Sequence, residues 1–350
     1  MPEPIVDPDA PVLVTGGTGY VASWIVRYLL EDGRTVRATV RDPNKPTGLE
    51  HLHALAAEHD GRLTLHRADL LEDGSFTDAM AGCELVIHTA SPFLLGKVRD
   101  PEAQFVRPAL EGTRNVLASV DRTGSVKRVV LTSSVAAIYG DNADMQGKDR
   151  FTETDWNTTS TIDHQPYAYS KTVAEREAWQ LQAAQDRWDL VTIHPGLVLG
   201  PSLTDVSVSG SMATMKHFTD GTMALGAPNL ALGVVDVRDV ARMHIAAGFT
   251  PAAHGRYIAT AGTTTMLGIS QILRGEFGNR WSFPRFELPK FMIKLAAPTA
   301  GLTRRYVDRN VGWPLAFDNT RGPVELGVRF RPAAESVTEH FRQMTGGARP

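Results

Sequence analysis

The sequence predicts an α/β fold in which a doubly wound parallel sheet carries a smaller, mixed C-terminal lobe. Over the first 200 residues, short aliphatic and β-branched runs alternate with helical patterns, as in a parallel sheet with helices on both faces. After Gly200 this alternation loosens, and Gly, Ser, Thr and Met become frequent up to about Gly233. We therefore predict a sheet domain over residues 1–200, rejoined by elements at about 231–250, and a second lobe over most of 201–350.

The elements of the sheet domain follow in order along the chain. Strands are expected where apolar runs are bounded by turn residues, at 12–14, 35–40, 63–66, 85–87, 129–131 and 190–193. Helices are expected over about 20–31, around Leu49–Leu55, over 101–121 with a bend or late start at Pro108, and from Pro166 onward. Ligands of such a sheet bind at the carboxyl ends of its strands.

Composition narrows the class of partner. The 350 residues are 42% hydrophobic and 21% charged, with a net charge of −3 that is spread along the chain. This balance predicts neither nucleic acid nor an anionic membrane as a partner. The single cysteine, Cys83, favours a reducing compartment. With no membrane-length apolar run and no signal-peptide pattern at the start, we expect a cytoplasmic protein, monomeric or homodimeric.

A glycine loop follows the first strand and opens the first helix. Glycines at this place let the backbone approach a pyrophosphate, and the helix N-terminus offers unpaired N–H groups. A Rossmann-like dinucleotide site is therefore expected, with Ala22 in the last glycine position of the pattern. The residues predicted to contact the cofactor here are Thr15, Gly16, Thr18, Gly19, Tyr20 and Val21.

The end of the second strand predicts which dinucleotide binds. NAD sites place a carboxylate there for the ribose hydroxyls, whereas this sequence has Val40 followed by Arg41. A guanidinium can bind a 2′-phosphate with two hydrogen bonds. We therefore predict NADP(H), held by Arg41 with help from Lys45, and treat Arg37 as the weaker candidate.

Tyr167 and Lys171 form a Tyr-x-x-x-Lys pair near the start of the long helix. The spacing places both side chains on one helix face. A cation beside a phenol lowers the pKa of that phenol, which makes it a proton donor near neutral pH. Ser133 and Ser134 end the fifth strand at the same sheet edge, and a hydroxyl there can orient a substrate oxygen. We favour Ser134 over Ser133 for this role.

These segments resemble the extended short-chain dehydrogenases/reductases. Matches include Val14–Tyr20, the step from Val36 to Asp42, Leu131–Ser134 and the Tyr167–Glu175 segment. Others are Glu111–Leu117, Pro195–Pro201, Asp236–Ala241 and Glu325–Pro332, so the resemblance extends along nearly the whole chain. Within the family, the sequence is most similar to dihydroflavonol 4-reductases, cinnamoyl-CoA reductases and microbial aldehyde and ketone reductases.

The resemblance assigns roles to particular residues. It implies Ser134, Tyr167 and Lys171 as the catalytic set, with Tyr167 and Lys171 also touching the cofactor. It leaves Asn115 in a structural or relay role. The further cofactor contacts that it implies are Asp69 and Leu70 near the adenine, Thr89, Ala90 and Ser91 by the nicotinamide half, and Pro195, Gly196 and Val198 near the carboxamide.

The expected reaction is hydride transfer from NADPH to a ketone or aldehyde, with a small carbonyl compound as substrate. An epimerase-type enzyme, a steroid dehydrogenase-type enzyme and a non-catalytic NADP-binding sensor are the alternatives. Val135 and Ala136 stand where dehydratases of this family carry an Asp-Glu pair. The family resemblance does not extend to the segment 200–233, so it does not identify the residues that bind the substrate there.

Two other groups of residues are interpreted as structural. His51 and His53 point to different sides of a helix and lack a third ligand, so we expect surface histidines and no metal. Phe283, Phe286, Phe291 and Met292 either form a substrate lid or pack in the core, and core packing is preferred.

Overall fold

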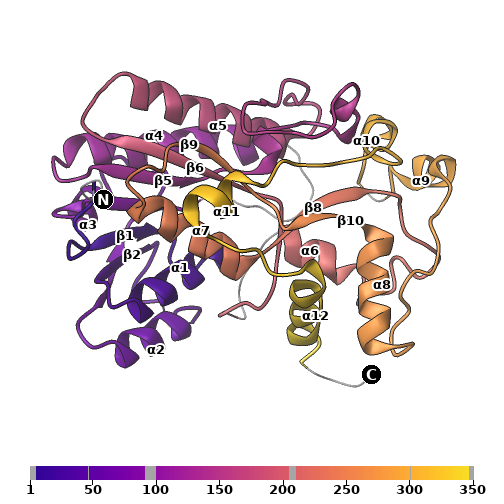
Figure 1. The fold of residues 1–350 in the computed structure, drawn as a ribbon, viewed down its shortest axis with the longest axis horizontal. Coiled ribbons are helices and arrows are strands. Elements are labelled where there is room, and N and C mark those ends of the chain that lie inside the picture. Colours follow the sequence, from indigo (N-terminus) through magenta and orange to yellow (C-terminus); the bar gives the residue numbers. More distant parts are fainter. Residues whose placement is uncertain (1–4, 46, 91–99, 205–209, 300, 347–350) are drawn as a thin grey trace.

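A computed structural model describes residues 5–45, 47–90, 100–204, 210–299 and 301–346. Its centre is a seven-stranded parallel sheet in the order β3-β2-β1-β4-β5-β6-β9 (Figure 1). The strands are β1 (Val12–Thr15), β2 (Val36–Val40), β3 (Leu63–Arg67), β4 (Leu85–His88), β5 (Arg128–Thr132), β6 (Asp189–Pro195) and β9 (Gly255–Ala259). The order reverses beside β1, which places the switch point of the sheet between β1 and β4.

Helices cover both faces of this sheet. One layer contains α1 (Tyr20–Glu31), α2 (Glu50–Glu58) and α7 (Val237–Phe249); the other contains α3 (Thr77–Met80), α4 (Arg107–Arg122) and α5 (Pro166–Ala183). In β1, Val12 and Val14 pack toward the first layer and Leu13 toward the second. Because successive strand residues point to opposite faces, a continuous apolar run is what a sheet covered on both sides requires. The predicted α/β class is confirmed.

A three-stranded sheet lies beyond the main sheet (Figure 1). Its order is β10-β8-β7, with β8 parallel to β7 and antiparallel to β10. These strands are β7 (Leu197–Leu199), β8 (Ala231–Asp236) and β10 (Gly262–Thr265). The remaining helices are α6 (Gly210–Lys216), α8 (Met266–Phe277), α9 (Lys290–Ala296), α10 (Arg304–Asn310), α11 (Arg321–Leu326) and α12 (Ala333–Met344).

The segment 231–250 divides between the two sheets. Its helix, α7, packs against α1 on the main sheet, whereas its strand, β8, pairs within the small sheet. The strand that completes the main sheet is β9, which pairs with β6 from Val191 to Pro195. The chain thus enters the small sheet at β7, returns with α7 and β9, and leaves again at β10.

Pro108 and the aromatic residues of the second lobe differ in part from expectation. Pro108 lies in the first turn of α4, where no N–H is needed, and the turn before it (Glu102–Val106) is a π-helix. Phe283 is buried against Phe341, with ring centroids 5.4 Å apart. Core packing is wrong for the other three, Phe286, Phe291 and Met292, which are all exposed.

No helix in the described part of the chain is long and apolar enough to cross a membrane.

Candidate active site

A cavity of about 450 Å³ opens at the carboxyl edge of the main sheet and is also lined by β7 and β8 of the small sheet. Ten predicted site residues line it: Gly19, Tyr20, Val21, Thr89, Ser134, Tyr167, Lys171, Pro195, Gly196 and Val198. They come from the start of α1 and the loop before it, from the segments at the ends of β4, β5 and β6, from the first turns of α5 and from β7. Parallel strands deliver these segments to one edge because their carboxyl ends all lie there.

The glycine loop leaves room for a bound group. Gly16 has φ +68°, and a Cβ on it would stand 3.0 Å from Ala90, so a side chain would be strained and crowded. Gly19 is the N-cap of α1, and no side chain caps that helix end. The N–H groups of the first turn therefore remain available for a phosphate. Thr18 is half-buried in this loop. These features fit a dinucleotide pyrophosphate.

Thr15 is completely buried, and its hydroxyl group forms hydrogen bonds with the end of β4 and the residues that follow it. Its Oγ1 is 2.8 Å from His88 Nδ1 and accepts a hydrogen bond from the Ala90 N–H at 3.1 Å. Thr89 Oγ1 donates to the Thr15 carbonyl at 2.6 Å. Thr15, Thr89 and Ala90 thus fasten the ends of β1 and β4 to each other. Predicted residue Ser91 lies outside the described residues.

Arg41 and Lys45 are exposed directly after β2, while Val40 is buried in the core. The neighbouring carboxylate of Asp42 accepts a hydrogen bond from the Asn44 N–H at 2.9 Å and so caps its own turn. Arg37 is occupied elsewhere, because its Nη1 donates to the carbonyls of Ala79 and Ala81 at the end of α3. A 2′-phosphate at this edge would meet cations on the 41–45 turn.

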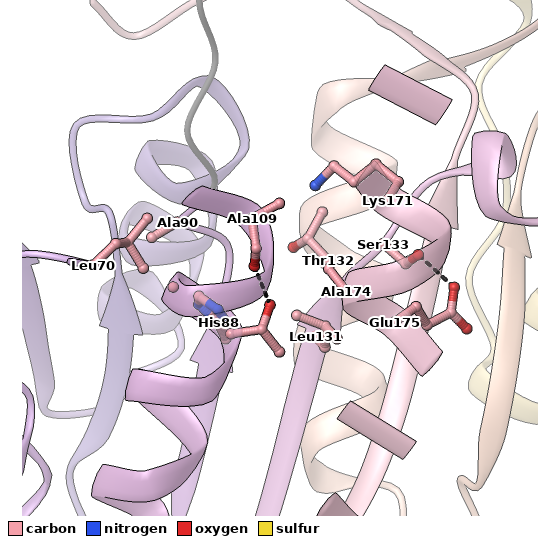
Figure 2. A pocket seen from close by; sticks show the side chains of 12 residues that line it. Leu70, His88, Ala90, Ala109, Leu131, Thr132, Ser133, Lys171, Ala174 and Glu175 are labelled. Atoms are coloured by element: carbon pink, nitrogen blue, oxygen red, sulfur yellow. Dashed lines mark hydrogen bonds between the residues drawn. The ribbon is translucent and has the colours of Figure 1, made fainter. Parts of the chain in front are cut away.

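Asp69 and Leu70 form a turn after β3. The Asp69 carboxylate accepts the Leu71 N–H at 2.9 Å, and the Leu70 carbonyl accepts a hydrogen bond from Asn115 Nδ2 at 2.8 Å. Asn115 therefore anchors the turn from α4. Leu70 and Ala90 line a second, small cavity of about 20 Å³, together with Lys171 (Figure 2).

The catalytic candidates meet on one wall of the large cavity. Ser134 Oγ caps the short 3₁₀ turn after β5, accepting the Ala136 N–H at 3.1 Å, and it hydrogen-bonds Tyr167. Ser133 also lines this cavity, and its hydroxyl donates to Glu175 at 2.6 Å. Of the two serines, Ser134 is therefore the one that hydrogen-bonds Tyr167. The helix that carries Tyr167 begins after Gln165, whose unusual φ of +57° is held by a hydrogen bond to Asp141.

The pKa of Tyr167 departs in the direction opposite to expectation. The Tyr167 residue is 37% exposed at the cavity. The protein atoms packed around its ring nevertheless desolvate the phenol and raise the pKa of Tyr167, and the hydrogen bond with Ser134 offsets only part of that rise. Lys171 is itself shielded from water, which lowers its pKa to about 8, although Glu175 pulls that pKa upward. The expected lowering of the Tyr167 pKa is therefore not found, because desolvation is the largest influence on this phenol.

Pro195 and Gly196 join the two sheets. A Cβ on Gly196 would lie 2.4 Å from the Gly233 carbonyl oxygen in β8, and a Cβ on Gly233 would lie 2.7 Å from the ring of Phe317. Backbone therefore packs on backbone at this junction, which we call the glycine seam. Pro195, Gly196 and Val198 are placed by it along one side of the cavity.

Several residues at the site were not found from the sequence. The cavity is also lined by Val135, Tyr139, Leu197, Ser211 and Leu232, which belong to segments without a diagnostic spacing. His51 is half-buried behind the glycine loop, with its Nε2 3.0 Å from Ser23 Oγ, so it is not a plain surface histidine. Glu175 follows Lys171 by one helical turn, and this spacing could have indicated from the sequence that the two side chains lie close together.

The chain is similar to known reductases along most of its length. It is 40% identical over 289 residues to cinnamoyl-CoA reductase CAD2 of Medicago truncatula, covering 80% of this chain and 82% of that protein. It is 34% identical over 286 residues to an anthocyanidin reductase of Vitis vinifera, covering 79% and 82%. The yeast methylglyoxal/isovaleraldehyde reductase Gre2, solved in complex with NADPH, superposes with a TM-score of 0.77 at 26% identity, covering 97% of this chain and all of that one.

The family model described as "NAD dependent epimerase/dehydratase family" matches residues 12–257, from β1 through most of β9. This range contains the glycine loop, Ser134, Tyr167 and Lys171. The expected resemblance is confirmed: the chain belongs to the NAD dependent epimerase/dehydratase family, within the extended short-chain dehydrogenases/reductases.

Proposed function

We propose that this protein is an NADPH-dependent carbonyl reductase that converts a ketone or aldehyde to an alcohol. The observation that carries the proposal is the meeting of Ser134, Tyr167 and Lys171 on the wall of a cavity that also contains the glycine loop. The cofactor assignment rests on Arg41 and Lys45 after β2, and the structural neighbour Gre2 was solved with NADPH. Bound NADPH supplies the hydride.

The protein side chains bind and protonate the oxygen of the substrate carbonyl. Ser134 donates a hydrogen bond to this oxygen and fixes the carbonyl against Tyr167. Tyr167 then gives its phenolic proton to the oxygen as negative charge develops. Because burial raises its pKa, Tyr167 carries this proton throughout the neutral range. Lys171 lies one turn away, where its ammonium would hold the nicotinamide ribose and compensate the phenolate left behind.

The other cavity walls favour a neutral carbonyl compound with an aromatic or aliphatic substituent. Val135, Tyr139, Leu197 and Leu232 offer apolar surface beyond the catalytic wall. Burial of such surface is the main source of affinity in small-molecule pockets. Val135 and Ala136 supply no acid or base after Ser134, which favours reduction over elimination of water. A cytoplasmic location and a monomeric or homodimeric state belong to the same proposal.

The test is a screen of NADPH oxidation with aryl ketones, β-keto esters, aldehydes, dihydroflavonols and cinnamoyl-CoA. We expect turnover with at least one neutral carbonyl substrate. Tyr167→Phe should bind NADPH normally but lose about 10²-fold or more in kcat, because the proton donor is gone. Near-normal kcat in this variant, with NADPH affinity intact, would overturn the role of Tyr167. NADPH binding without turnover on any carbonyl would favour the sensor alternative.

A further inference from the structure

Glu175 is a buried carboxylate one helical turn beyond Lys171. Only 1% of its side chain is exposed. It accepts hydrogen bonds from Ser133 Oγ at 2.6 Å, from His194 Nε2 at 2.8 Å and from Arg256 Nε at 2.7 Å. Trp179 Nε1 adds a fourth donor from the next turn of α5, at 3.2 Å. Glu175 therefore ties α5 to β6, to β9 and to the turn that ends β5.

This arrangement keeps Glu175 ionised. A buried carboxylate is costly unless it is paired and hydrogen-bonded. The donors from Arg256 and His194 hold the pKa of Glu175 well below its usual range, despite burial. The Glu175 carboxylate is thus a buried negative charge, 2.7 Å from the Arg256 guanidinium and on the lining of the small cavity that Lys171 also lines.

Lys171 responds to this charge. The small cavity of about 20 Å³ is lined by both Lys171 and Glu175, with His88 on the β4 side (Figure 2). Among the titratable neighbours of Lys171, burial and the charge of Lys171 lower the pKa of His88 to about 3, so His88 is neutral. Tyr167 is a neutral phenol at neutral pH. Glu175 is the group that favours the ammonium form of Lys171 against desolvation.

Glu175 also fixes the hydroxyl of Ser133. Figure 2 shows the Ser133 side chain joined to Glu175 and directed away from Lys171. Ser133 and Ser134 both line the large cavity, but the Ser133 hydroxyl is bonded to Glu175, whereas Ser134 hydrogen-bonds Tyr167.

We propose that Glu175 is a positioning residue of the active site: held by His194 and Arg256, its carboxylate stabilises the ammonium form of Lys171 and engages the Ser133 hydroxyl, which leaves the Ser134 hydroxyl to bind the substrate. The role of Lys171 toward NADPH rests on the proposed function. The charge effect on Lys171 can be measured without turnover, through the pH dependence of NADPH binding.

The main variant is Glu175→Gln, which keeps the shape and removes the charge. We expect NADPH affinity, followed by tryptophan fluorescence, to match the parent near pH 6 and to be about threefold weaker near pH 8, because Lys171 loses its proton earlier. Glu177→Gln is the matched control on the same helix, since Glu177 pairs with Arg114 at 2.6 Å. It should reproduce the parent profile. A pH-independent loss of affinity in Glu175→Gln would mean a structural role only and would overturn the proposal.

Arg256→Gln provides the test of opposite sign. Removing the guanidinium leaves the Glu175 charge less compensated, so the alkaline loss of NADPH affinity should move to higher pH. If Glu175→Gln does not fold, the pH profile of Arg256→Gln alone tests the proposal. No shift, or a shift to lower pH, contradicts the inference. If the parent binds NADPH with the expected profile but reduces no carbonyl, the proposed function fails while the inference about Glu175 stands.

Discussion

We expect Val40 and Arg41 to determine the choice between NADPH and NADH. Val40 is buried at the end of β2, and the next residue is an exposed cation. The double substitution Val40→Asp and Arg41→Asn would supply the carboxylate that a ribose 2′-hydroxyl needs and remove the phosphate partner. We expect the ratio of kcat/KM for NADPH to that for NADH to fall by about 10²-fold.

Arg37→Gln is the control for this change, because its guanidinium binds the end of α3. It should leave the cofactor ratio unaltered. An unchanged ratio in the double variant would show that Arg41 does not hold the 2′-phosphate. The position of Arg41 could be predicted from the sequence, because it follows from the spacing of the strand and the loop. The bonds from Arg37 to α3 could not, because they join Arg37 to carbonyls that lie 42 and 44 residues further along the chain.

At the scale of elements, α7 is fastened to β5 by a buried histidine. His244 Nδ1 donates to the Val240 carbonyl at 2.8 Å, so the neutral ring accepts the Thr132 hydroxyl at Nε2, 2.7 Å away. Burial lowers the pKa of His244 to about 4. In the unfolded chain a histidine has a pKa near ~6.5. The contribution of His244 to stability is therefore present above about pH 6.5 and is lost as the pH falls toward 4.

We expect about 2 kcal/mol of the free energy of unfolding to disappear between pH 7 and pH 5 because of His244. His244→Gln, which cannot titrate, should lose that much less over the same interval in urea denaturation. His254 is exposed, and His254→Gln should behave as the parent does. Equal pH dependence in all three proteins would show that His244 carries its proton in the folded state.

For the whole molecule, cofactor binding and folding are linked. The glycine loop, Tyr167 and the β6–β7 junction line one cavity only in the folded state. At a concentration of about 100 times its Kd, NADPH should raise the free energy of unfolding by about 2.7 kcal/mol. Thermal denaturation with and without NADPH measures this, and removing NADPH by gel filtration should reverse it. No stabilisation would contradict the dinucleotide site.

The parts of the molecule that sequence could predict are those determined by nearby residues. The central strands β1, β4, β5 and β6 were predictable because they contain apolar runs buried on both faces, and β2 and β3 because hydrophobic residues recur in them between turn residues. Strand β9 and the small sheet were not, since their pairing joins segments distant in the chain, and β10 (Gly262–Thr265) is Gly and Thr only. Likewise, Tyr167 and Lys171 follow from a helical spacing, whereas Tyr139 and Leu232 reach the cavity only through the tertiary fold.

The glycine seam has a consequence for anyone who wants to redesign this pocket. A side chain at Gly196 would collide with the backbone of β8, and one at Gly233 would collide with the Phe317 ring, so we expect most substitutions at these two positions to disturb folding. Substitutions are better made at Val135, Tyr139, Leu197 and Leu232, whose side chains line the cavity and do not belong to the glycine seam. The two glycines of the seam should therefore be kept, whereas the other residues that line the cavity can be varied.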